Sequence, residues 1–187
     1  MKAFIHLIQR YATGKHIAVL FMLTMAVYIL MLSYSIPAVS AFAPELPLFD
    51  LSPSGYSYAY ANELLYSLGA EGRDLYLFTQ LPLDFIYPGM FSITYSLLLA
   101  WVFGKIFLTS SRINYCLIVP FLAGIFDYAE NLFIIKMLSS YPDLQVGTVK
   151  IASTFTILKS SFTLLFFVLL AVGLVLLLKQ KLTNTRK

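Results

Sequence analysis

The chain has 187 residues, of which 59% are hydrophobic and 12% are charged, and its mean hydropathy is +0.81. Soluble domains carry about twice that charged fraction, so the composition excludes an ordinary soluble domain and predicts a single membrane-embedded one. The net charge of +4 is not gathered into a basic run mixed with aromatic residues, so nucleic acid is not an expected partner.

Four apolar stretches are long enough to cross a bilayer, whose hydrocarbon core of about 30 Å needs about 20 helical residues. They predict an all-α polytopic membrane protein, a four-transmembrane-helix bundle forming one domain over residues 1–187. The expected spans are residues 16–34, 81–103, 113–138 and 150–178.

The first span is followed by Ala38-Val39-Ser40-Ala41, which resembles a signal-peptidase site. The apolar stretch before it is longer than the roughly 7–15 residues of a signal h-region, and a long positive segment precedes it. We therefore expect the span to be retained as a helix.

Residues 35–80 are the one long connection, and their proline-rich opening predicts irregular structure. Ser57 can cap a short helix through Leu68 that ends at Gly69. Tyr58, Leu65 and Tyr66 suggest that this helix is amphipathic and lies on the membrane surface or over the mouth of the bundle. The alternative is a packed structural loop.

Basic residues concentrate on one side of the spans, while the carboxylates of the connecting segments lie on the other. The positive-inside rule therefore predicts cytoplasmic N- and C-termini in an inner or plasma membrane. The basic residues on the predicted cytoplasmic side are Lys2, Arg10, Lys15, Lys105, Arg112, Lys179, Lys181, Arg186 and Lys187.

Four ionisable residues interrupt the spans: Asp84, Asp127, Glu130 and Lys159. A charge near the bilayer centre costs about 2.5–3.5 kcal/mol on insertion scales, so such residues should face the bundle interior and pair with one another. Three carboxyls against one lysine leave an excess of negative charge. Either Arg73 or Lys136 reaches in, or at least one carboxyl stays protonated.

Helical spacing places polar residues on one face of each of three spans. Asp127, Glu130 and Asn131 are three and four residues apart, and Thr156 and Lys159 belong to a polar stripe. We expect these faces to converge in a pocket open to the outer side. The candidate ligand-binding residues are Asp84, Tyr87, Asp127, Glu130, Asn131, Thr156, Lys159 and Arg73.

Smaller features of the spans concern how closely the helices approach. Pro82 and Pro88 should kink the second span and leave backbone carbonyls free as acceptors. Gly124 extends the polar face of the third span and should let another helix come close.

No metal or cofactor is expected. Cys116 is the single cysteine, and His6 and His16 both precede the first span, so they cannot form an intramembrane haem pair. The sequence also contains no phosphate-binding loop and no hydrolase motif.

These observations favour a protein that binds a lipid or a small amphipathic molecule, with membrane lipids as its partners. One alternative is an accessory or assembly subunit, with a protein partner or a second copy of the chain, in which the polar cluster is structural. The other is an intramembrane acid/base enzyme acting on a lipid, whose catalytic residues the sequence does not identify.

Three runs of the sequence resemble an uncharacterised family of small bacterial four-helix integral membrane proteins. They are GAEGRDLYL at 69–77, LDFIYP at 83–88 and DYAEN at 127–131, which carry the patterns GRxxYL, LDxxxP and DxxEN. The resemblance implies a four-helix fold in a bacterial inner membrane and supplies no reaction.

Overall fold

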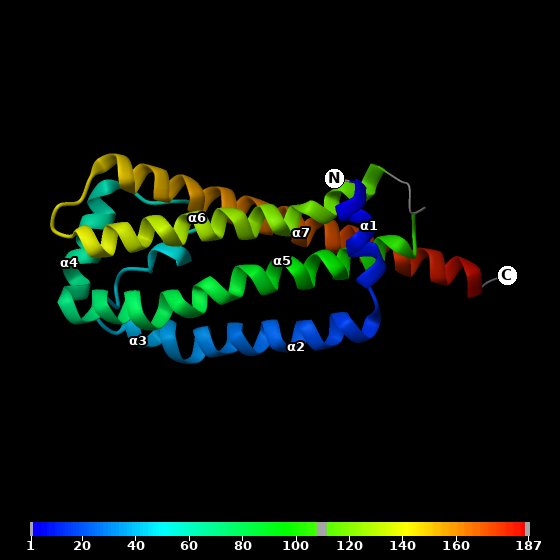
Figure 1. The fold of residues 1–187 in the computed structure, drawn as a ribbon, viewed down its shortest axis with the longest axis horizontal. Helices are drawn as coiled ribbons and strands as arrows, with labels where there is room; N and C mark the ends of the chain where they lie inside the picture. Colours follow the sequence, from blue (N-terminus) through cyan, green and yellow to red (C-terminus); the bar gives the residue numbers. More distant parts are fainter. Residues whose placement is uncertain (1, 108–111, 186–187) are drawn as a thin grey trace.

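The computed structural model describes residues 2–107 and 112–185, and all regular secondary structure within them is helical. Arg186 and Lys187, counted above among the basic residues, lie outside this part of the chain. In chain order the helices are α1 (Lys2–Tyr11), α2 (Gly14–Leu30), η1 (Met31–Ser35), α3 (Ile36–Ser40), η2 (Phe49–Leu51), α4 (Tyr58–Leu75), η3 (Tyr76–Gln80), α5 (Leu81–Gly104), η4 (Arg112–Ile118), α6 (Val119–Ser140) and α7 (Val146–Thr185) (Figure 1).

Four helical stretches are long and apolar enough to cross a membrane: Gly14–Ser40, Tyr58–Gly104, Arg112–Ser140 and Val146–Thr183. Their long helices α2, α5, α6 and α7 run along the long axis of the molecule, with both chain ends at one end and α4 at the other (Figure 1). The predicted all-α fold, with four helices long and apolar enough to cross a membrane, is confirmed.

The connection between the first two spans is shorter than predicted. The first helical stretch continues through the π turn η1 and through α3 to Ser40, and the chain is irregular mainly over residues 41–57. Pro37 does not stop the helix, because it directly follows the π turn η1, whose wider hydrogen bonding accommodates the missing N–H. The long loop over residues 35–80 is therefore not confirmed.

Helix α4 begins where the sequence indicated, because the Ser57 side chain accepts a hydrogen bond from the Tyr60 N–H at 3.2 Å. Gly69, with a φ of 62°, breaks the helix without ending it. A surface-lying amphipathic helix is not confirmed. Leu64 and Leu65 are fully buried in the bundle, while Tyr66 is exposed.

Two π turns lie next to each other where α3 and α5 begin. In η1 the N–H of Ile36 bonds to the Met31 carbonyl, and in η3 the N–H of Leu81 bonds to the Tyr76 carbonyl. A proline follows each of these two donors directly in the sequence. A proline has no N–H to donate to the carbonyl four residues before it. In the wider π turn, the residue before the proline donates to the carbonyl five residues before itself, so the helix continues through the proline.

Helix α1 was not anticipated from the sequence. It crosses the end of the bundle that carries both chain ends (Figure 1). Its apolar residues Ile5 and Ile8 are buried in the hydrophobic cluster of that end, and the Phe4 ring packs edge-on against Phe121 of α6 at 5.1 Å.

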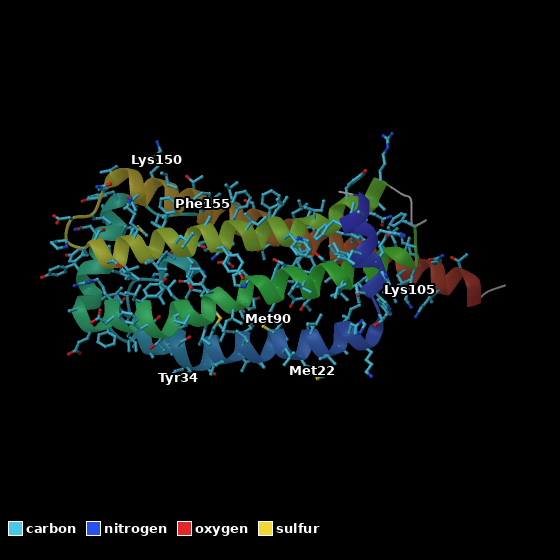
Figure 2. The ribbon with its side chains drawn as sticks, in the orientation of Figure 1. Met22, Tyr34, Met90, Lys105, Lys150 and Phe155 are labelled. Carbon is cyan, nitrogen blue, oxygen red and sulfur yellow. The ribbon has the colours of Figure 1, made fainter. Side chains whose placement is uncertain are left out.

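The buried apolar residues form two clusters, one at the α4 end and one at the end with the chain termini. Lys105 and Lys150 mark these opposite ends of the bundle, and Met22 and Tyr34 lie along its outer face (Figure 2). Between the two clusters, helices α5, α6 and α7 each carry buried polar residues. On α5 the buried polar residues lie between Leu81 of the α4-end cluster and Phe91 of the other cluster. The corresponding pairs are Ile134 and Ala123 on α6, and Ala152 and Phe166 on α7. The bundle therefore contains a polar layer between two apolar ones.

Candidate functional site

The centre of the polar layer is an ion-pair network between α6 and α7. The Glu130 side chain is fully buried; its Oε1 accepts a hydrogen bond from Thr156 Oγ1 at 2.6 Å, and its Oε2 pairs with Lys159 Nζ. Lys159 Nζ also lies 3.4 Å from Asp127 Oδ1. These four residues, singled out from the sequence, therefore contact one another inside the bundle.

Asn131 joins this network to helix α5. Its Nδ2 donates a hydrogen bond to the backbone carbonyl of Asp84 at 2.9 Å. Pro88, four residues after Asp84, has no N–H to offer that carbonyl. The sequence prediction that a proline frees a carbonyl for a neighbouring side chain is confirmed at this position.

Helices α5 and α6 approach closely beside the same proline. A Cβ atom on Gly124 would overlap Ser92 Oγ and would lie 2.9 Å from the Pro88 carbonyl oxygen. Ser92 Oγ lies 2.7 Å from that oxygen and 3.1 Å from the Pro120 carbonyl oxygen. As predicted, the glycine allows this packing.

Unlike the carboxyl groups of Asp127 and Glu130, that of Asp84 forms no ion pair with Lys159. Asp84 is only 4% exposed, and its Oδ2 is buried with no hydrogen-bond partner within residues 2–107 and 112–185. The ion pairs of Lys159 go to Asp127 and Glu130 instead. A buried carboxyl oxygen without a donor is unfavourable, so the site is incomplete on this side.

A cavity of about 620 Å³ lies next to Asp84. Asp84, Asp127 and Lys159 form part of its wall, together with Tyr87, which stacks on Tyr28 at 5.5 Å between ring centroids. Helices α2, α5, α6 and α7 all contribute to the wall. Its remaining aromatic residues are Phe91, Tyr95 and Phe167.

Asp50 also lines the cavity and was not predicted as a site residue. It comes from η2, in the connection after the first span, and its two oxygens accept hydrogen bonds from the Tyr76 hydroxyl at 2.6 Å and from Gln80 Nε2 at 3.3 Å. Gln80 in turn accepts from Ser35 Oγ, which links the two π turns. Irregular segments carry no periodicity, so the sequence had no signal for the direction of this side chain.

The same connection is tied to α7 by Tyr56. Its N–H donates to Ser153 Oγ at 2.8 Å. Burial, together with the nearby charge of Glu130, raises the pKa of the Tyr56 hydroxyl above its usual value, so this side chain is a neutral phenol.

Arg73 does not belong to the cluster, contrary to the sequence prediction. Its Nη1 donates to the Leu65 carbonyl at 2.8 Å across the break at Gly69, and its guanidinium lies over the Tyr141 ring at 4.5 Å. Lys136 is exposed on α6. Neither residue lines the cavity, which leaves the second alternative for the described part of the chain: at least one carboxyl of the empty site stays protonated.

No protein-family model, curated protein or solved structure matches this chain. The similarity of the three sequence runs to small bacterial membrane proteins therefore stays a prediction. The argument for function has to come from the cavity and its residues.

Proposed function

We propose that this membrane protein binds a lipid or another small amphipathic molecule in the cavity between its helices. The observation that carries the proposal is the buried, unpartnered carboxyl oxygen of Asp84 beside a cavity of about 620 Å³. That volume lies in the range of about 300–1,000 Å³ that is typical of small-molecule sites.

The wall of the cavity is divided in a way that suits an amphipathic molecule. Asp84 and Asp127 offer carboxyl oxygens on one part, while Met25, Phe91 and Phe167 offer apolar surface on another. A polar group on the acidic side would complete the hydrogen bonding that the protein leaves open, and a chain or ring would cover the apolar side.

We infer that the cavity opens sideways toward the hydrocarbon of the membrane. The rim residues Leu32, next to α2, and Leu164 and Phe167, on α7, are exposed at 46%, 65% and 49%. Apolar side chains with this exposure favour contact with acyl chains, so a molecule dissolved in the bilayer can reach the cavity directly. The sequence had indicated an opening toward the outer side instead.

The proposal includes the orientation that the basic residues favour, with both chain ends in the cytoplasm. In a Cys116→Ser background, Asp143→Cys in the α6–α7 loop should react with a membrane-impermeant maleimide on intact cells. Lys179→Cys on α7 should react only after permeabilisation. The reverse pattern would contradict the orientation and would leave the cavity proposal standing.

Native mass spectrometry of the full chain released from mild detergent tests the binding itself. We expect a bound lipid or amphipathic molecule on the wild type, and clearly less of it on Thr163→Phe, which places an aromatic ring inside the cavity. Ile151→Phe is the matched control, because Ile151 lies on the same helix and is exposed outside the cavity. If the wild type binds no amphipathic compound, or Thr163→Phe binds as the wild type does, the proposal fails.

A structural role for part of the cluster is favoured by Glu130, which accepts a hydrogen bond from Thr156 and forms an ion pair with Lys159. The accessory-subunit alternative extends that role to the whole cluster and predicts a co-purifying protein with an empty cavity. The same mass spectra separate the two functions.

A further inference from the structure

Resting on the proposed binding function, we propose that the cavity selects molecules with a positively charged amine group and discriminates against neutral and anionic ones. The observation behind this is the excess of acidic over basic side chains around the cavity. Asp50, Asp84 and Asp127 line it, and Lys159 is the one basic residue of the described chain that does so.

Lys159 cannot balance these carboxyls, because it is already engaged. Its Nζ pairs with Glu130, which lies behind the wall, and with Asp127 at 3.4 Å. Asp84 has neither an ion pair nor a hydrogen bond at Oδ2 in the described residues. An N–H donor that carries positive charge is the group that such an oxygen lacks.

The carboxyl of Asp50 adds to the same preference. It is held in place by the Tyr76 hydroxyl and the Gln80 amide, which are neutral donors and bring no positive charge. An anionic group entering the cavity would meet Asp50 and Asp84 with no free cation to receive it. This argues against a phosphate or a carboxylate as the bound group.

The aromatic wall also favours a cation. Tyr28 and Tyr87 stack on each other in the cavity wall, and Phe91 and Tyr95 lie edge-to-face at 4.6 Å further along α5. Ring faces attract ammonium groups when water is excluded, and the same rings pack against a hydrocarbon tail. A metal ion is a poorer fit, because the described residues contain no group of three metal-ligating side chains close enough together.

Titration calorimetry on the full chain in lipid nanodiscs, with empty nanodiscs subtracted, tests the selection with three probes of equal chain length. Dodecylamine is the cation, dodecanol the neutral reference and dodecanoate the anion. We expect dodecylamine to bind at least about tenfold more tightly than dodecanol, and dodecanoate to bind more weakly than either.

Asp84→Asn should remove most of the preference for dodecylamine over dodecanol and leave dodecanol binding unchanged. Asp143→Asn, an exposed carboxylate outside the cavity, is the matched control and should leave both affinities as they are. The comparison of the three probes on the wild type stands even if a variant does not fold.

The outcomes separate this inference from the proposed function. Equal binding of dodecylamine and dodecanol, or tighter binding of dodecanoate, overturns the charge selection while the cavity remains a binding site. Binding of none of the three compounds overturns the binding function as well as the selection.

Discussion

Removal of the Lys159 charge is the sharpest test of how the polar layer is held together. Lys159→Met keeps a long apolar side chain but leaves Glu130, whose side chain is 0% exposed, and Asp127, whose side chain is 12% exposed, without their cation. Breaking a buried pair in this way costs about 3–5 kcal/mol, because the remaining charge is buried without compensation. We expect the free energy of unfolding to fall by that amount.

The assay is equilibrium unfolding of the purified protein in mixed detergent micelles, followed by loss of helical circular dichroism. The double variant Glu130→Gln/Lys159→Met should be at least about 1.4 kcal/mol more stable than Lys159→Met, since it removes the orphaned charge. Lys150→Met, on the same helix but exposed, should change stability by no more than about 0.5 kcal/mol. If Lys159→Met is as stable as Lys150→Met, the ion-pair network does not stabilise the bundle and this reasoning is wrong.

Three further changes probe the contacts around the site. Asn131→Leu should lower the unfolding free energy by about 1–3 kcal/mol in the same assay, because the Asp84 carbonyl loses its donor; an unchanged midpoint would count against that bond. Gly124→Ala should cost about 1–3 kcal/mol through overlap with Ser92, and Gly124→Ala/Ser92→Ala should regain part of it; no gain in the double variant would place the strain elsewhere. Leu164→Trp, at the exposed rim, should slow association and dissociation of dodecylamine together in stopped-flow measurements; unchanged rates would argue against a sideways opening.

The features predictable from the sequence are those governed by apolar length and helical period. The four long helices follow from their apolar residues, and the contact of Glu130 with Thr156 and Lys159 follows from the cost of charge in lipid. Pro88 and Gly124 were informative because a missing N–H and a missing Cβ each have a local consequence. Each of these predictions requires only the sequence of one helix or of two helices that face each other.

The features that were missed depend on how segments far apart in sequence fold back. Asp50 reaches the cavity because the connection turns inward against Tyr76 and Gln80, and no local pattern encodes that turn. Arg73 was assigned to the cluster from charge balance alone, but the Leu65 carbonyl and the Tyr141 ring engage it first. Counting charges shows that the buried carboxyls need compensation. It does not show which basic residue can reach them.

The polar layer divides into two halves that have different consequences. Glu130, Thr156 and Lys159 satisfy one another, and a layer that only locked α6 against α7 would need nothing more. Asp84 adds a second buried carboxyl that no side chain of the described chain completes, and it lies beside the cavity rather than within the packed network. An unpartnered buried carboxyl destabilises the folded state. A bound molecule that supplies the missing donor would explain why Asp84 occupies this position. The stability of Asp84→Asn without any added compound should therefore equal or exceed that of the wild type, whereas a purely structural role for Asp84 requires a loss.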